Sequence, residues 1–141
     1  MEKHDIVLAC CYGDLETMRN YLVNGGNPNM INEKVGWPLI FHAIDNFQME
    51  VIRLLLENGA NVNIRDVFGQ TALFLAVDTS LDSIIQGGGE LGTERIDCIQ
   101  LLLENGADIN IKNKDGIGPF EIARTYNSHK VIALLRNWSV M

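Results

Sequence analysis

The chain has 141 residues, of which 47% are hydrophobic and 21% charged, so it is long enough for one globular domain over residues 1–141 and lacks the composition of a disordered chain. Its 11 basic and 18 acidic residues give a net charge of −7, and no basic run supplies the stripe that a phosphate backbone requires. We therefore expect no nucleic-acid partner. The acidity either serves solubility or attracts a basic partner, and both interpretations stay open.

The amino terminus and the cysteines bear on the compartment. Charged residues stand where a signal peptide needs an apolar core, and no apolar run approaches the length of a membrane-spanning helix. Cys10, Cys11 and Cys98 lack CxxC spacing and fit reduced thiols. These features predict a cytoplasmic protein that has no membrane partner.

One short segment recurs along the chain. Residues 24–29 read Asn-Gly-Gly-Asn-Pro-Asn, and similar segments follow at 58–63 and 105–110, which are 34 and then 47 residues further on. The second interval equals the first period with roughly 13 or 14 residues inserted. This periodicity predicts four similar units, at about residues 1–32, 33–65, 66–112 and 113–141.

Each unit is predicted to hold a short helix and a longer one. Apolar residues at helical spacing mark the longer helices: Met18, Tyr21 and Leu22; Val51, Ile52 and 54–56; Ile96, Ile99 and 101–103. Gly25, Gly59 and Gly106 follow where the chain must leave a helix through a left-handed residue. The short helices carry a small residue where close packing is required: Ala9, Ala43, Ala76 and Ala123.

The insertion in the third unit, near residues 81–93, begins with Leu81, Ile84 and Ile85 at helical spacing, which predicts a further helical turn before a glycine-rich loop. Residues 87–92 satisfy the GxGxxG pattern of dinucleotide-binding loops. No alternating strands and helices surround that pattern, so a flexible loop explains the glycines better than a nucleotide site does.

These units resemble ankyrin repeats, which open with Gly-x-Thr-Pro-Leu-His-x-Ala and close with Leu-Leu-Leu-Glu-x-Gly-Ala and Asp/Asn-Val-Asn. Residues 54–63 and 101–110 match the closing motif nearly in full. The opening motif is less complete, because Pro38 and Gly118 replace its Thr, which only Thr71 keeps, and because its His position holds Phe41, Phe74 and Glu121. The resemblance implies an all-α ankyrin-repeat solenoid of four helix-turn-helix units with β-turn tips and an extended loop in the third.

The resemblance also implies a binding surface, since ankyrin repeats bind other proteins through their turn tips and the exposed side of their first helices. The matching tip residues are Lys34, Val35, Trp37, Val67, Phe68, Gln70, Lys114, Asp115 and Ile117. The matching helix residues are Tyr12, Asp45, Asn46, Asp78, Thr79, Thr125 and Tyr126, with Cys11 beside them.

Four aromatic residues in this set are the candidate anchors: Tyr12, Trp37, Phe68 and Tyr126. Rigid aromatic side chains at the centre of an interface carry much of its binding energy. The competing interpretation places Trp37 and Phe68 under their own turns as core residues; the choice is even for Phe68 and favours binding for Trp37.

The sequence shows no residue pattern that is typical of a catalytic site. The histidines form no metal-ligand pattern, no base accompanies a thiol, and Asp78 and Asp82, one helical turn apart, are better explained as a solvated face than as an acid–base pair. We predict a protein-binding module that is monomeric when unbound, has no cofactor and is not an enzyme. The partner is expected to be another protein, with inhibition of a basic toxin or enzyme as the specific hypothesis. An adaptor in a larger complex is the alternative, and a nucleotide-using enzyme is the remote one.

Overall fold

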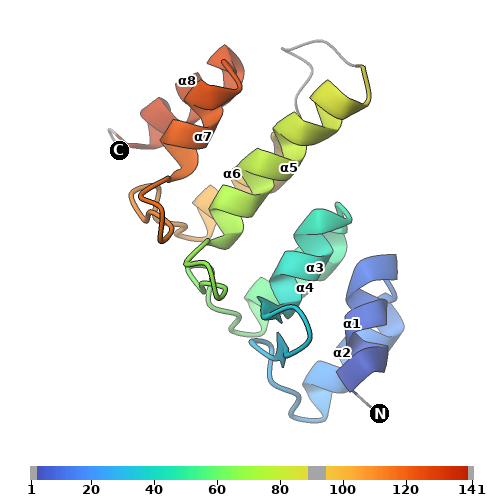
Figure 1. Ribbon diagram of the computed structural model, residues 1–141. Helices are drawn as coiled ribbons and strands as arrows, with labels where there is room; N and C mark the ends of the chain where they lie inside the picture. The colour runs from blue at the N-terminus through green and yellow to red at the C-terminus, as the bar shows by residue number, and fades with distance from the viewer. Residues whose placement is uncertain (1–2, 89–94, 140–141) are drawn as a thin grey trace.

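The computed structural model describes residues 3–88 and 95–139 and consists of four helix pairs stacked side by side (Figure 1). The helices are α1 (Lys3–Tyr12), α2 (Leu15–Val23), α3 (Leu39–Asp45), α4 (Met49–Glu57), α5 (Ala72–Gln86), α6 (Asp97–Glu104), α7 (Pro119–Thr125) and α8 (His129–Ser139). Two strands, β1 (Ile31–Asn32) and β2 (Trp37–Pro38), form a small antiparallel hairpin between α2 and α3. The predicted helical fold with turn tips is therefore confirmed.

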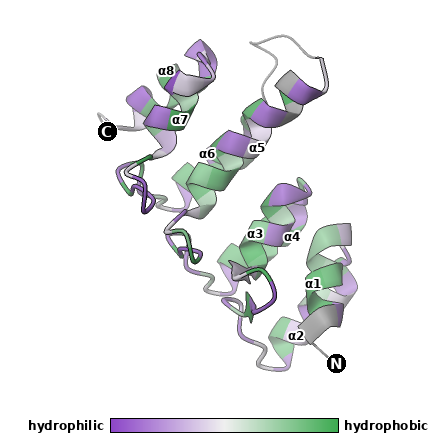
Figure 2. Ribbon diagram, viewed as in Figure 1, coloured by the Kyte–Doolittle hydropathy of each residue, from purple (hydrophilic) through white to green (hydrophobic). Residues whose placement is uncertain are grey.

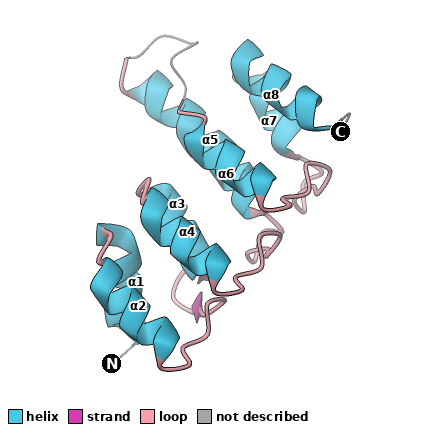
Figure 3. Cartoon of the chain, turned by 180° about the vertical axis from the view of Figure 1, so that it is seen from behind, coloured by secondary structure: helices cyan, strands magenta, loops and turns pink. Residues whose placement is uncertain are grey.

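The helices form two layers. The odd-numbered helices pack on one another in the order α1, α3, α5 and α7, and each even-numbered helix packs on the odd-numbered helix that precedes it. All the connecting loops from an even-numbered to an odd-numbered helix lie along the same edge of the stack (Figures 1 and 3). We call the odd-numbered helices the inner layer and those loops the tips.

The core lies between the layers and between neighbouring repeats. The small residues predicted to allow close packing are confirmed there, since Ala9, Ala43, Ala76 and Ala123 are all buried. The apolar stripes of the outer helices α4 and α6 face the same core through residues such as Ile52. Burying these stripes against a neighbour is what stabilises a stack of repeats that would not be stable singly.

Helix ends follow the predicted pattern. Gly25, Gly59 and Gly106 have φ values of 88°, 91° and 90°, in the left-handed region that glycine adopts without a side-chain clash. Just before each glycine, an asparagine side chain donates a hydrogen bond to the carbonyl four residues earlier, as Asn58 does to Leu54 O at 2.8 Å. The Asn-Gly pair thus closes the outer helix in three successive repeats.

Asparagine side chains also join neighbouring repeats. Asn29 Oδ1 accepts a hydrogen bond from the backbone N–H of Asn61 at 2.7 Å, and Asn63 Oδ1 accepts one from the N–H of Asp108 at 2.8 Å. Asn29 and Asn63, which accept these bonds, are the last residues of the first two copies of the recurring segment. The segment therefore ends one helix and also sets the position of the next repeat.

The third repeat departs from its neighbours. Its inner helix α5 has 15 residues, whereas α3 and α7 have seven each. The predicted helical turn after Leu81 is confirmed as a continuation of α5 to Gln86. Leu81 itself is fully buried, so the start of this extension belongs to the core. The predicted glycine loop lies mostly outside the described residues, because residues 89–94 are not among them.

Candidate protein-binding interface

The tips are shaped by one Asn or Asp side chain at the base of each loop. Asp66 Oδ1 accepts hydrogen bonds from the backbone N–H groups of Phe68 and Gln70, at 2.9 and 3.0 Å. Asn113 Oδ1 accepts the equivalent pair from Asp115 and Ile117. The first tip is one residue longer, and there Asn32 Oδ1 accepts from Lys34 N at 3.2 Å within the β1–β2 hairpin.

These anchoring residues, Asn32, Asp66 and Asn113, were not singled out from the sequence. Their signal is local, since Asn and Asp side chains readily bond the backbone N–H two residues on. Asp66 is buried, and its Oδ2 has no hydrogen-bond partner among the described residues.

Neighbouring tips touch. The N–H of Lys114 donates to the carbonyl of Phe68 at 3.0 Å, which joins the tips of repeats three and four. Gly36, with φ of 70°, lies so close to the tip of repeat three that a Cβ there would stand 2.7 Å from Cγ1 of Val67. The tips of repeats two, three and four therefore form one continuous ledge along the stack.

The ledge exposes apolar side chains. Phe68 is 61% exposed, Val67 55%, Val35 51% and Ile117 37%. Exposed apolar side chains that adjoin one another on a surface are more informative than the same residues scattered singly. Lys34, Lys114 and Asp115 are exposed on the same ledge.

Trp37 and Phe68 differ in environment although both come from tips. The Trp37 ring is partly buried and meets Phe41 and His42 edge-on, with ring centroids 5.9 and 5.3 Å away. Phe68 has no such cover. The structure thus assigns Trp37 a packing role on α3, and its role as a binding anchor stays a prediction.

The inner-layer residues predicted to bind lie at equivalent positions of the odd-numbered helices, where α1, α3 and α7 end and the longer α5 is midway along its length. We call this set the helix-end row: Cys11, Tyr12, Asp45, Asn46, Asp78, Thr79, Thr125 and Tyr126. Tyr12 is 78% exposed and Asp45 is exposed beside it on the next helix. Asn46, Thr79 and Thr125 donate side-chain hydrogen bonds to backbone carbonyls of their own helices. Those three side chains are therefore already engaged within the protein.

Asp78 and Tyr126 are joined across two repeats. The hydroxyl of Tyr126 donates to Asp78 Oδ1 at 3.2 Å. Partial burial raises the pKa of Tyr126 to about 12, and the negative charge of Asp78 adds to that effect. Burial also raises the pKa of Asp78, against the lowering by the Tyr126 bond, and nearby Asp82 raises it further. Tyr126 is thus a positioned residue, unlike the open Tyr12.

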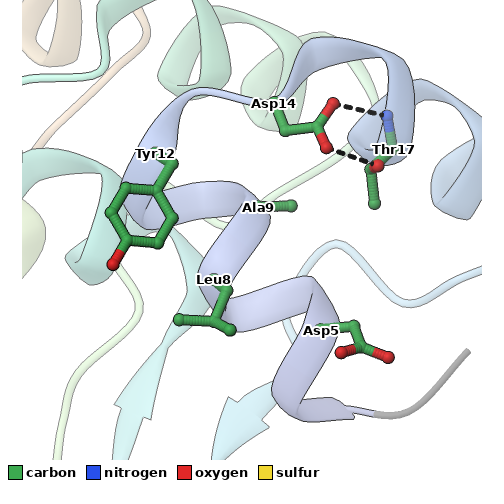
Figure 4. A pocket seen from close by; sticks show the side chains of 6 residues that line it. All are labelled: Asp5, Leu8, Ala9, Tyr12, Asp14 and Thr17. Carbon is green, nitrogen blue, oxygen red and sulfur yellow. Dashed lines mark hydrogen bonds between the residues drawn. The ribbon is translucent and has the colours of Figure 1, made fainter.

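A shallow depression lies at the free face of the first repeat (Figure 4). Its lining residues are Asp5, Leu8, Ala9, Tyr12, Asp14 and Thr17. Asp14 there caps α2, because its carboxylate accepts hydrogen bonds from Thr17 N at 3.1 Å and Thr17 Oγ1 at 2.6 Å, which lowers the pKa of Asp14. The depression therefore has a structural carboxylate and no arrangement of a nucleophile with a base.

Leu8 in this depression was missed by the sequence analysis. It is 37% exposed, whereas the equivalent residues of the next two repeats, His42 and Leu75, are 8% and 6% exposed. Among the described helices, α3 and α5 each pack between two inner helices, whereas α1, which carries Leu8, packs on one inner helix, α3. The exposure of Leu8 depends on position in the stack, which residue type alone does not reveal.

Within the described residues no helix is long and apolar enough to cross a bilayer. The same part of the chain contains no group of three or more His, Cys, Asp or Glu side chains placed to hold a metal ion. Burial raises the pKa of the Cys10 and Cys98 thiols to about 12, and both are buried core residues. The ledge, by contrast, exposes four apolar side chains of the described residues: Val35, Val67, Phe68 and Ile117.

Comparison with known proteins agrees with this geometry. Residues 6–113 match the family described as ankyrin repeats, in three copies, and the chain belongs to that family. The ankyrin-repeat domain of Bcl-3 superimposes with a TM-score of 0.74 at 28% sequence identity, over 93% of this chain and 50% of that one. Ankyrin repeats are protein–protein interaction modules.

Two curated relatives illustrate how widely the family is distributed. A putative ankyrin repeat protein of fowlpox virus is 29% identical over 84 residues, which are 60% of this chain and 14% of that protein. An ankyrin repeat-containing protein of Schizosaccharomyces pombe is 31% identical over 71 residues, which are 50% of this chain and 34% of that protein. The matches therefore cover 14% and 34% of the length of these two relatives.

Proposed function

We propose that this chain is a non-catalytic module that binds one protein partner stoichiometrically across the ledge and the helix-end row, and that it acts as an inhibitor of the immunity-protein type. The observation that supports this most is the continuous ledge, on which Val35, Val67 and Phe68 are exposed side by side. Exposed apolar residues held on a rigid backbone bind with little loss of conformational entropy.

The described tip geometry supports Phe68 as the principal anchor of this proposed interface. Its backbone is fixed by hydrogen bonds from its N–H to Asp66 and from Lys114 N–H to its carbonyl, while its ring is open to solvent. We expect Phe68→Ala to weaken partner binding by about 2 kcal/mol, as for a central aromatic anchor, and to leave the fold intact. Trp37→Ala should instead lower the melting temperature, because its ring packs on α3.

The test is a pull-down from the host with tagged wild-type protein, the Val67→Ser/Phe68→Ser variant and a Val23→Ser control, followed by mass spectrometry. Val23 is 83% exposed at the end of the outer helix α2, so the control also removes an exposed apolar side chain. A partner retained by wild type and control but lost with the tip variant supports the proposal. Equal retention by all three would overturn it.

The inhibitory part needs a second measurement. The purified chain should abolish the activity of the captured partner at a molar ratio of one, whereas an adaptor should leave that activity unchanged and bind a second protein at the same time. Saturable binding of NAD or ATP by the purified chain would contradict the non-catalytic part.

A further inference from the structure

The proposed binding surface has two sides with different chemistry. The ledge carries apolar side chains in the two central repeats and lysines, Lys34 and Lys114, toward its two ends. The helix-end row carries Asp45 and Asp78 in the same two repeats, with Asp82 one turn further along α5. In Figure 2, the ends of α3 and α5 that lie farther from the tips include hydrophilic residues. A ligand lying along the stack would meet apolar groups on one side and carboxylates on the other.

Within the described part of the chain, Asp45 and Asp78 of the helix-end row form no ion pair. Among the described residues, the ion pairs join Arg53 to Glu50, Arg95 to Asp97 and Lys112 to Glu121, and none reaches Asp45 or Asp78. Arg95 lies over the Phe47 ring at 4.5 Å and pairs with Asp97. No Lys or Arg occurs at any position of the row itself.

Backbone dipoles add to this negative potential. The inner helix α3 ends at Asp45, so the negative end of its dipole lies at the same edge as the carboxylate. The field reaches the neighbouring repeat: burial raises the pKa of the Cys11 thiol, and the charge of Asp45 raises it further. A cation placed between the second and third repeats would therefore gain from two carboxylates and a helix end together.

Building on the function proposed above, we propose that the partner presents a cationic, amphipathic polypeptide segment, with aliphatic or aromatic side chains on the ledge and Lys or Arg side chains against Asp45 and Asp78. Lys34 and Lys114 disfavour the reverse orientation, because they would face the cationic side of the segment. Packed helices lie roughly 8–10 Å apart, so the two cations should be spaced by about 10 Å, or roughly seven residues of helix. The open ring of Tyr12 can supply a cation–π contact at the end of the row.

The experiment is a selection of peptides from a displayed random library of 16-residue peptides on the purified full chain. We expect the selected peptides to be enriched in Lys or Arg together with aliphatic or aromatic residues. Affinities of the synthesised peptides are then measured for wild type, Asp45→Asn/Asp78→Asn and a Glu57→Gln/Glu104→Gln control. The control removes the same number of charges from exposed positions at the ends of α4 and α6. Asparagine at 78 keeps an oxygen that can accept the Tyr126 hydroxyl.

The Asp45→Asn/Asp78→Asn variant should bind the selected peptides roughly tenfold more weakly at low salt, and the difference should shrink in high salt, because the attraction is between partly exposed charges. The control should stay within about twofold of wild type. Peptides without basic enrichment that still lose affinity on Phe68→Ala would overturn this inference and leave the proposed function standing. Peptides whose binding is insensitive to both the tip and the helix-end substitutions would overturn both.

Discussion

The inner helices of the second and third repeats start at equivalent positions, Leu39 and Ala72, and end differently. After α3 the chain turns at Phe47, whose φ of 53° is left-handed, and the equivalent residues of the first and fourth repeats, Gly13 and Asn127, are left-handed too. In the third repeat the equivalent residue is Ser80, which stays helical while α5 runs on to Gln86. The end of an inner helix is therefore set by how soon the next helix must begin, since α6 starts only at Asp97.

What keeps the extension of α5 in place is packing. Leu81 is fully buried, and Ser80 Oγ donates to the carbonyl of Arg95 at 3.0 Å, which ties the extension to the residues leading into α6. Arg95 in turn covers the Phe47 ring. The residues on both sides of the insertion, Leu81 and Arg95, are therefore held against the stack.

The largest effect should follow from Leu81→Ala. Removing a fully buried leucine leaves a cavity, and we expect a loss of about 2–4 kcal/mol in the free energy of unfolding, measured in urea. Ile84→Ala, on the partly exposed next turn, serves as the control and should cost less than half as much. Equal costs would mean that the extension does not pack as the comparison requires.

Glycine at the equivalent positions of the third and fourth repeats should give contrasting results. Ser80→Gly should destabilise by about 1–2 kcal/mol, because it places glycine inside a helix and removes the bond to Arg95 O. Asn127→Gly should change stability by no more than about 0.5 kcal/mol, in the stabilising direction, because Asn127 has a φ of 56°. Thermal melts of both variants test this; destabilisation by both would remove the distinction between the helix ends.

The beginnings of the two helices differ in their caps. Thr71 Oγ1 accepts the backbone N–H of Phe74 at 3.2 Å before α5, whereas Pro38 before α3 offers no side-chain cap. Thr71→Ala should therefore cost about 1 kcal/mol of unfolding free energy. The matched control is Thr125→Ala, where an exposed hydroxyl bonds a carbonyl of its own helix and little loss is expected. If chemical denaturation gave equal losses of unfolding free energy for Thr71→Ala and Thr125→Ala, the capping role of Thr71 would be contradicted.

The smallest effect concerns pH and His42 on α3. Burial lowers the pKa of His42 below its ordinary 6.5, against the opposing charge of Asp45. The unfolded chain therefore binds a proton more readily, and stability should be complete above pH 6.5 and decline as the pH falls below it. His42→Leu, which copies Leu75 at the equivalent place on α5, should flatten this decline. Thermal melts between pH 5 and 7 test this. If the melting temperature of His42→Leu fell with pH as steeply as that of wild type, groups other than His42 would cause the decline.

Much of this architecture could be predicted from the sequence, because periodicity and backbone conformation are local signals. The left-handed glycine at Gly59 and the buried Ala43 follow from residue type and repeat position. The environment of Trp37 could not be predicted in this way, because it depends on how the β1–β2 hairpin folds back on α3. The bond between Tyr126 and Asp78 joins residues 48 apart and depends on the spacing of helices in the stack.

The free face of the first repeat governs how separate copies of the chain meet. A stack of similar units has complementary ends, and head-to-tail addition of copies would continue it as an open-ended fibre. At that face Asp5 and Thr17 occupy positions at which the next repeat has Leu39 and Val51, both almost completely buried. Covering the carboxylate of Asp5 with a second copy would carry a desolvation cost, so polymerisation through this end is disfavoured.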